Sequence, residues 1–567
     1  MSWRAFFSTD HKVIGLLYAV TSLLFLLVGF LLVLVIRWQH AYAGQPLPVI
    51  GGLLGEWAPG GILLPEVYNQ LGAMHGTIMV FLGVVPLAVG AFGNYVLPLQ
   101  IVAPDMSFPR LNLLSWWCYA AGGAVMLASF FTPGGAAGSG WTSYAPLAVI
   151  ARDGQTWWLG GMLLLIFSSL LGALNFITTV VQLRAPGLTW FRLPFFVWAQ
   201  FVTAFLLLLA FPALQAAAIL QGMDRLADTS FFLPSGLVVG GQAVDRAGGG
   251  NALLWQHLFW FLAHPEVYVL VLPAMGIIAE VIANNTRKPL WGYPLMVYSL
   301  FVLGFLSFLV WAHHMFLTGM GTTISAFFQA TTMIISIPSV IILSALVLSL
   351  YGGSIRFTTP MLFALAFLPM FGIGGLTGLP LGLATTDIPL HDTNYVVAHF
   401  HYLVAPGTIF ALFAGIYYWY PKITGRVLNE TLGRIHFVGS LVCMNLIFMP
   451  MFAQGLAGVN RRLWDGGALY THAQETLYLN VPMAHAAVAL GVFQLAFVVN
   501  LLVTPRFGRV AGTNPWQATT LEWATATPPL AHGNFATPPR AWRGPYEYSV
   551  PDAAADFTPQ GDGPAST

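Results

Sequence analysis

Long apolar segments recur along this chain of 567 residues and limit the folds that it can adopt. A helix needs about 20 apolar residues to cross the ~30 Å hydrocarbon core of a bilayer. Twelve segments reach that length, so we expect an all-α, polytopic membrane protein with twelve transmembrane helices. The predicted spans are residues 14–37, 67–98, 112–132, 158–182, 194–221, 253–284, 295–317, 327–350, 360–380, 392–419, 435–457 and 481–504.

The composition excludes the main soluble classes of protein. Charged residues make up 7% of the chain, whereas a soluble globular protein has about 25%. The hydrophobic share of 57% also excludes a disordered chain, and the net charge of +1 offers no basic surface for nucleic acid. Cys118 and Cys443 both lie in apolar segments, which excludes a disulfide framework or a cysteine-rich metal cluster.

The chain divides into a membrane part and a C-terminal part. Residues 1–505 carry the twelve spans, and residues 506–567, rich in Pro, Ala and Thr, are predicted to form a polar cytoplasmic tail. The first apolar run is long enough to span and lacks a cleavage site, so we expect no cleavable signal. With twelve spans both termini share one side, and that side collects 15 of the 21 Lys and Arg residues. This bias predicts that both termini are cytoplasmic.

Half of the 14 histidines fall inside predicted spans, where ionisable residues are costly and usually functional. They are His75, His257, His264, His313, His314, His399 and His401, and His391 lies at the edge of a span. Polar residues in membranes also join helices by hydrogen bonds, and for one isolated histidine that alternative has equal weight. The spacing within this set favours metal ligation.

Two histidine pairs have spacings that suit metal centres. His399 and His401 lie about 200° apart around a helix, so one helix presents a ligand on each of two faces. His75 is a candidate second ligand for one of those centres, although it also fits a packing site. His313 and His314 are neighbours that both reach a metal between their faces, and imidazole is the usual ligand of copper, iron and zinc.

His264 begins a short motif with two further polar groups. Tyr268 lies four residues on and shares its face of the helix. Glu266, between them, has no evident reason to occupy apolar surroundings unless it moves protons. Burial favours the protonated form of such a carboxyl at neutral pH.

The segments around these residues resemble subunit I of the haem–copper terminal oxidases, the catalytic subunit of the cytochrome c oxidases. The resemblance rests first on WQHLFWFLAHPEVYVLVLP, VWAHHMF and HDTNYVVAHFHYLV. It continues from STDHKVIGLLY through GNYVLPLQIVAPDMSFPRLN and SSLLGALNFITT to GLAGVNRR, and it covers roughly residues 8–505.

The resemblance implies two haems A and one copper ion, with oxygen bound between the high-spin iron and the copper. It makes His75 and His401 the axial ligands of the low-spin haem, and His399 the single protein ligand of the high-spin haem. The implied copper ligands are His264, His313 and His314. In this family the tyrosine that matches Tyr268 is bonded covalently to the histidine that matches His264, and it supplies an electron and a proton when the O–O bond breaks.

Further residues match sites around the haems. Arg37 matches an arginine that bonds the formyl group of the low-spin haem, which favours haem A there. Arg461 and Arg462 match a pair that neutralises haem propionates, although either alone is also explained as a membrane-surface arginine. His391 and Asp392 match two ligands of a magnesium ion, a metal that prefers oxygen ligands.

The resemblance also implies a proton path. Asp105 matches the cytoplasmic mouth of the family's D-type channel, and its polar lining towards Glu266 matches Asn94, Asn112, Asn175, Ser168 and Ser169. Each lining residue alone is explained by helix packing, but the ordered set indicates a water wire. The family's second channel usually carries a lysine where this chain has Ile342, although Ser339 and Thr332 remain. Other departures are Gly321, Thr323 and Asn460.

Three other functions are alternatives to that of a cytochrome c oxidase. A secondary transporter with histidine proton relays predicts paired half-repeats, which the sequence lacks. Nitric oxide reductases share the six histidines but lack the tyrosine, so Tyr268 favours oxygen as the acceptor. Quinol oxidases carry a histidine at the position of Val67, so Val67 favours cytochrome c as the electron donor. They share Gln70 with this chain, so quinol stays an alternative donor.

The resemblance implies several partners. They are oxidase subunit II, which carries the dinuclear copper site that two isolated cysteines cannot build, subunit III, cytochrome c, O2 and membrane lipid. The implied location is a bacterial-type inner (plasma) membrane.

Overall fold

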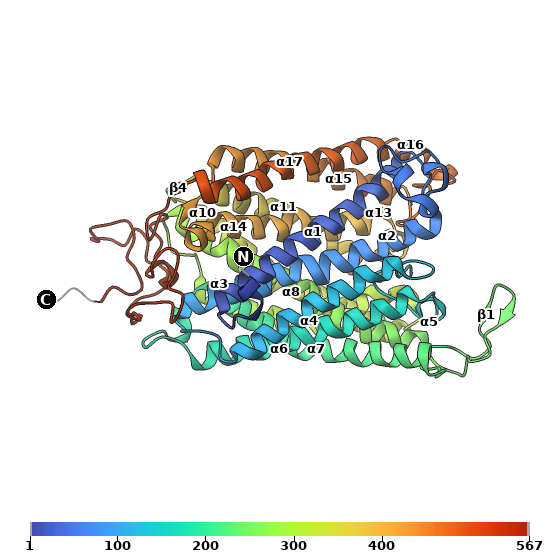
Figure 1. Ribbon diagram of the computed structural model, residues 1–567, viewed down its shortest axis with the longest axis horizontal. Helices are drawn as coiled ribbons and strands as arrows, with labels where there is room; N and C mark the ends of the chain where they lie inside the picture. The colour runs from blue at the N-terminus through green and yellow to red at the C-terminus, as the bar shows by residue number, and fades with distance from the viewer. Residues whose placement is uncertain (1–2, 564–567) are drawn as a thin grey trace.

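The computed structural model describes residues 3–563 as a bundle of long helices that run side by side (Figure 1). Within that range twelve helical segments are long and apolar enough to cross a membrane, and each overlaps one predicted span. The all-α prediction is therefore confirmed. The long helices are α1 (His11–Ala41), α4 (Pro109–Ala128), α6 (Gly154–Gln182), α7 (Phe195–Leu226), α8 (Ala252–Thr286), α9 (Tyr293–Ser307), α10 (Thr322–Leu350), α11 (Thr359–Leu381), α15 (Glu430–Leu456) and α17 (Asn480–Phe507).

The second and tenth spans are composite helices. The second joins α2 (Pro65–Thr77) to α3 (Phe92–Ile101) through π-helical turns at Ile78–Val84 and Pro86–Ala91. The tenth joins α13 (Asn394–Leu403) to α14 (Phe410–Thr424) through a π-helical turn at Val404–Ile409. Pro86 and Pro406 lie in these turns, and a proline disrupts the α-helical ladder because it lacks an N–H and crowds the preceding turn.

The remaining α-helices and the β-strands are short and lie at the ends of the bundle. They are α5 (Leu147–Ile150), α12 (Ala384–Leu390), α16 (Gln474–Leu477) and the strands β1 (Val238–Val239), β2 (Gln242–Ala243), β3 (Arg426–Val427) and β4 (Arg509–Val510). β1 pairs antiparallel with β2 in a hairpin that projects from one end, and β3 pairs antiparallel with β4 at the other (Figure 1).

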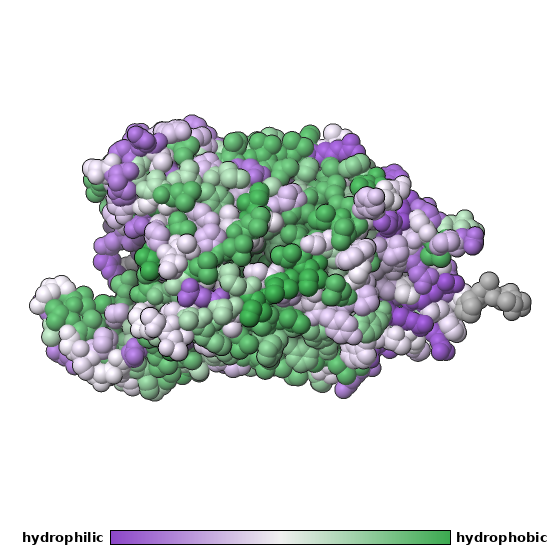
Figure 2. Space-filling view, turned by 180° about the vertical axis from the view of Figure 1, so that it is seen from behind, coloured by the Kyte–Doolittle hydropathy of each residue, from purple (hydrophilic) through white to green (hydrophobic). Residues whose placement is uncertain are grey.

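Burial follows the position of each helix in the bundle. The most apolar stretch of α8 is 89% buried, whereas those of α1 and α17 are 22% and 28% buried. A broad hydrophobic belt covers the middle of the surface, and hydrophilic residues gather towards both ends (Figure 2). α8 is thus the central helix, and the site that it carries is enclosed by protein.

Both ends of the described chain lie at one end of the bundle, which we call the terminal end; the β1–β2 hairpin projects from the far end (Figure 1). Residues 508–563 fold against the terminal end instead of extending from it as a polar tail. Leu521, Trp523, Tyr546 and Tyr548 are buried there. Apolar and aromatic side chains scattered without helical periodicity anchor this segment, which we call the terminal cap.

Candidate active site

Three histidines from two spans meet inside the bundle. His264 lies on α8, and His313 and His314 lie on a 3-10 segment, Trp311–Thr318, that follows α9. His264 Nδ1 and His313 Nε2 lie 3.3 Å and 3.1 Å from His314 Nε2. One nitrogen from each ring lies within 4.8 Å of the others, an arrangement that suits a metal with imidazole ligands.

Neighbouring groups orient two of these rings. The Thr332 hydroxyl donates to the carbonyl of Phe328 at 2.5 Å, so its oxygen accepts from His313 Nδ1 at 3.0 Å. This bond leaves His313 Nε2, the atom that faces the cluster, without a proton. Trp260 stacks on His314 with ring centroids 3.8 Å apart and an interplanar angle of 11°. Trp260 was not predicted from the sequence, although this residue lies one helical turn before His264.

One ring nitrogen of His264, Nδ1, lies in the histidine cluster, and the other, Nε2, lies on the opposite side of the ring. Its Nε2 is buried and has no hydrogen-bond partner among residues 3–563. The ring of Tyr268 lies beside it, with centroids 5.0 Å apart, because α8 continues as a regular helix through Pro265. The spacing of four residues therefore brings these two side chains together as expected.

The other three predicted ligands share one pattern of hydrogen bonding. His75 Nδ1 donates to Gly29 O at 2.8 Å, His399 Nδ1 to Gly374 O at 2.9 Å and His401 Nδ1 to Val397 O at 2.8 Å. A carbonyl only accepts, so Nδ1 carries the proton in each ring and Nε2 is left with a lone pair. Each ring is thus prepared to ligate a metal through Nε2.

Space and charge around these rings are also arranged for a bulky group. A Cβ atom at Gly378 would lie 2.8 Å from Cε1 of His399, so glycine leaves room for that ring. Arg37 is 9% exposed on α1, the helix whose Gly29 carbonyl accepts from His75. Phe448 stacks on His401 with ring centroids 4.5 Å apart.

Glu266 is a buried acid without partners. It is 1% exposed, and neither carboxyl oxygen has a hydrogen-bond partner within the described part of the chain. An ionised carboxylate in that position would lack any compensating partner, so burial there favours the protonated form.

A cavity of about 40 Å³ lies between the first, second, third and fourth spans. Asn94, Ser168 and Ser169, three predicted path residues, line it. Its wall also contains Tyr18 and Ser115, whose hydroxyl oxygens lie 2.9 Å apart, and these two were not predicted. The volume and the polar wall satisfy the requirements for ordered water.

The other predicted path residues lie nearer the terminal end. Asp105 lies in the loop between α3 and α4, where burial raises the pKa of its carboxyl although the neighbouring His11 opposes the rise. Asn175 holds the start of α4, accepting from Phe108 N at 3.0 Å and donating to Phe108 O at 3.1 Å. Nδ2 of Asn112 is buried and has no partner among the residues that the structure describes.

At the far end, the charged residues form a compact network. Arg461 Nε donates to Asp392 Oδ1 at 2.8 Å, and His391 Nδ1 lies 3.0 Å from Asp387 Oδ2. Burial opposes the charged form of His391, but the hydrogen bond and charge of Asp387 outweigh it and raise the pKa of His391. Burial likewise opposes ionisation of Asp392, yet Arg461 lowers its pKa overall. Arg462, the residue after Arg461, has a left-handed φ of 68°. Asp387 was not predicted from the sequence.

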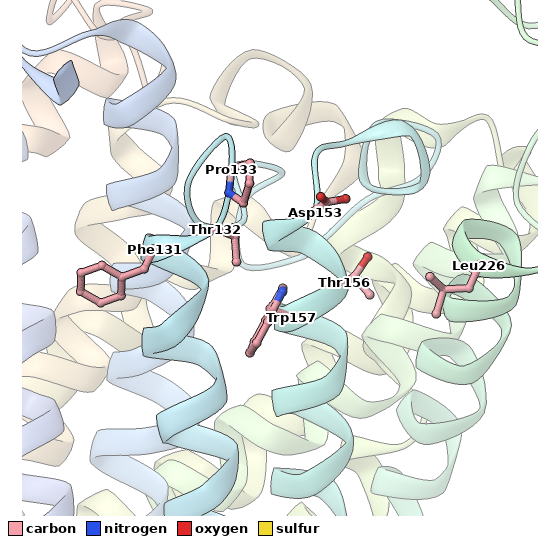
Figure 3. Close-up of a pocket in the computed structure, with 7 residues that line it drawn as sticks. All are labelled: Phe131, Thr132, Pro133, Asp153, Thr156, Trp157 and Leu226. Atoms are coloured by element: carbon pink, nitrogen blue, oxygen red, sulfur yellow. The ribbon is translucent and has the colours of Figure 1, made fainter.

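A surface hollow of about 420 Å³ lies apart from this site, at the ends of α4, α6 and α7 (Figure 3). None of the predicted site residues lines it. Its lining is Phe131, Thr132, Pro133, Asp153, Thr156, Trp157 and Leu226.

Comparisons with known proteins agree with this geometry. The family described as Cytochrome C and Quinol oxidase polypeptide I matches residues 13–493. Cytochrome c oxidase subunit 1 of Synechocystis sp. is 43% identical over 551 residues, which covers 97% of this chain and 93% of the relative. Alternative cytochrome c oxidase subunit 1 of Bradyrhizobium diazoefficiens is 43% identical over 571 residues, with 99% and 94% covered. A solved heme-copper terminal oxidase dimer shares the fold, with a TM-score of 0.71 at 21% identity over 88% of this chain and 85% of that one.

The fold and the clustered histidines therefore define a haem–copper oxidase, and the resemblance stated from the sequence is confirmed. The chain belongs to the cytochrome c and quinol oxidase polypeptide I family, as its subunit I. It is an oxidoreductase of the respiratory type that works with haem, copper, oxygen and other oxidase subunits.

Proposed function

We propose that this chain reduces O2 to water with electrons from cytochrome c and couples the reaction to proton pumping. The cluster of His264, His313 and His314 beside Tyr268 carries this proposal. It provides a copper site next to a phenol that is able to complete the reduction of oxygen.

The donor atoms of this chain fit the metals that the proposal requires. His264, His313 and His314 would hold copper, His75 and His401 a low-spin haem A, and His399 a high-spin haem A. Nδ1–H bonds to carbonyls or a hydroxyl leave Nε2 available in His75, His313, His399 and His401. These groups supply the redox chemistry when bound.

The side chains around the metals position protons. Tyr268 gives an electron and a proton when the O–O bond breaks, and the unpartnered Nε2 of His264 is the atom available for a covalent bond to it. Glu266 accepts a proton from the water-lined path and passes it on, because its buried, unpartnered carboxyl has no other acceptor or donor to hold it.

The proposed proton path begins at Asp105 and ends at Glu266. The cavity lined by Asn94, Ser168 and Ser169 supports it, because it has room and partners for water. Asn112 adds an unpartnered amide near the mouth. Asn175 supports the path indirectly, since both its hydrogen bonds hold Phe108 in the loop that carries Asp105.

The far-end network fits propionates and a magnesium ion. Arg461 and Arg462 provide positive charge for haem propionates, and Arg37 provides it for the low-spin haem. His391 Nε2 and Asp392 Oδ2 lie 3.9 Å apart, and these two side chains would hold a magnesium ion, which prefers oxygen ligands. This chain then supplies two ligands to magnesium.

Cytochrome c is the proposed donor in preference to quinol. Gln70 is the residue shared with quinol oxidases, but its amide donates to Gly134 O at 2.9 Å and accepts from Ala136 N at 3.1 Å. It therefore braces a loop and is not free to bind a quinol. Electrons enter through a dinuclear copper site on subunit II, and subunit III completes the assembly.

The proposed orientation places the terminal end in the cytoplasm of a bacterial-type cell, with the chain in its inner membrane. The excess of Lys and Arg on that side supports it. Proton uptake through Asp105 then starts in the cytoplasm.

An absorbance spectrum and an oxygen-consumption assay of the purified complex test the proposal. We expect two haems A and one copper per chain, and turnover with reduced cytochrome c but not with quinol. In His313→Ala, copper and oxygen reduction should be lost while the low-spin haem spectrum survives. Loss of both haem signals together, or turnover with quinol alone, would contradict the assignment.

A further inference from the structure

The terminal cap is fastened to the bundle by polar contacts from two buried basic residues, Arg287 and Lys422. Arg287, 2% exposed at the end of α8, makes two bonds of 2.8 Å to Asp556. Lys422, fully buried at the end of α14, donates to Thr525 O at 2.9 Å and Thr527 Oγ1 at 2.7 Å. These contacts hold the cap in place over the ends of the helices.

One further cap residue, Asn534, reaches the loop that carries Asp105. It is fully buried and has a left-handed φ of 62°, a conformation that asparagine tolerates. Its Nδ2 donates to Ala103 O at 2.7 Å, two residues before Asp105. Its Oδ1 accepts from Lys12 Nζ at 2.7 Å. The side chain thus ties the mouth loop to the start of α1.

The same amide also faces His11, the first residue of α1. His11 Nδ1 lies 2.6 Å from Asn94 O, so Nδ1 carries a proton. When His11 is neutral, its Nε2 accepts from Asn534 Nδ2 at 2.8 Å. When His11 is protonated, Nε2 donates to Asn534 Oδ1 at 3.1 Å. An asparagine amide therefore accommodates both forms of this histidine without moving it.

His11 is well placed to exchange protons with the path. It donates to the backbone of Asn94, which lines the cavity, and its charge acts on Asp105. The other charged groups that face it are Lys12 and Asp10, which form an ion pair at 3.0 Å. His11, the backbone of Asn94 and the loop that carries Asp105 are thus joined at Asn534, which contacts His11 and Ala103 O directly.

We propose that Asn534 is a positioning residue for proton uptake: it holds His11 against the loop that carries Asp105 in both protonation states of the imidazole. The cap then takes part in the proton path of the oxidase, through one amide contributed from the other end of the sequence. This inference rests on the proposed role of Asp105 as the mouth of the path.

The test measures proton uptake by the assembled oxidase complex in vesicles across a range of pH. Asn534→Ala should slow uptake about five-fold, the factor that corresponds to loss of one hydrogen bond. Asn534→Asp replaces the amide donor by a carboxylate that favours the protonated imidazole. It should therefore retain uptake and move the alkaline limb of the pH profile to higher pH.

Asn514→Ala is the matched control, because Asn514 is a cap asparagine whose side chain bonds only to Ala518 within the cap, at 2.8 Å and 2.9 Å. It should leave the rate and pH profile unchanged. Equal slowing in Asn514→Ala and Asn534→Ala would show general loosening of the cap and overturn the proposal. Wild-type uptake and an unmoved pH profile in both Asn534 variants, with normal haem spectra, would also overturn it.

Asp105→Asn separates this inference from the proposed path. If uptake is slow in Asp105→Asn, and Asn534→Ala adds no further slowing in that background, both act on one route and the inference is supported. If uptake is slow in Asp105→Asn but normal in Asn534→Ala, only the role of Asn534 is wrong. Normal uptake in Asp105→Asn would overturn the path itself.

Discussion

The Nδ1 atom of His313 lies 3.0 Å from the Oγ1 atom of Thr332 on the neighbouring span α10. The hydroxyl of Thr332 is itself committed to Phe328 O at 2.5 Å. The threonine therefore fixes which nitrogen of His313 carries the proton, and so which nitrogen is offered to the metal.

Thr332→Val should weaken copper binding without changing either haem. Valine keeps the shape but leaves His313 Nδ1 without an acceptor, and loss of such an outer hydrogen bond costs about 10- to 100-fold in metal affinity. Copper content measured after dialysis against a chelator checks this. Thr331→Val is the control, since the Thr331 hydroxyl bonds only to Phe327 O and Phe328 O of its own helix. Full copper retention in Thr332→Val would contradict the assigned role.

Gly378→Ala should disturb the high-spin haem selectively. An added methyl group would lie 2.8 Å from Cε1 of His399, and a contact below 3.0 Å forces the ring to shift. Gly375→Ala, on the same helix, adds a methyl that meets nothing within 4 Å among the described residues. The carbon monoxide difference spectrum of the reduced enzyme reports the high-spin haem. Equal spectra for the two variants would argue against His399 as its ligand.

Glu266→Gln should block turnover while leaving haem reduction intact. Glutamine fills the same buried space but cannot release or accept the transferred proton. Removal of an essential proton carrier typically costs on the order of 100-fold or more in rate. Oxygen consumption measured together with the reduced haem spectrum distinguishes this from misfolding. Unchanged activity and pumping would show that protons reach the metal centre without Glu266.

Asp105→Asn should be at least as stable as the unmodified protein at neutral pH. Burial raises the pKa of Asp105, so its contribution to stability is full at acidic pH and is lost as the pH rises through the folded value. Asparagine carries no charge and avoids that loss. Thermal inactivation of the purified complex should therefore favour the variant at neutral pH, with the difference vanishing at acidic pH. Lower stability at neutral pH would contradict the burial argument.

Ile342→Lys should leave turnover nearly unchanged or raise it. Ile342 is fully buried, and the hydroxyls of Ser339 and Thr332 donate to Ile335 O and Phe328 O of their own helix. This stretch therefore offers few hydrogen-bond partners for water.

If α10 carries no second proton route, Asp105→Asn should slow the reduction of the metal centre as well as its reoxidation by oxygen. Stopped-flow reduction of the metal centre decides the point. A normal reduction rate in Asp105→Asn would show a second route despite Ile342.

The twelve spans could be predicted because each depends on local sequence, whereas the meeting of His264 with His313 and His314 was implied by the family resemblance alone. Apolar length alone locates a membrane helix, and the spacing of His264 and Tyr268 fixes their shared face. Asp387 lies four residues before His391 and could have been predicted from that spacing, whereas Tyr18 and Ser115 were missed because their contact joins segments far apart in the chain. The folding of the terminal cap was missed for the same reason: Trp523 and Tyr546 are buried by surfaces that lie hundreds of residues earlier in the sequence.

The π-helical turns in the second span change the direction in which its second half faces relative to its first half. His75 precedes both wide turns and Asn94 follows them, and each wide turn holds a residue more than an α-helical ladder. Each extra residue offsets everything beyond it by about 100° of rotation. The half of this span that carries His75 and the half that lines the cavity at Asn94 can therefore each face a different part of the bundle, as two short helices would, while the chain still crosses the membrane once.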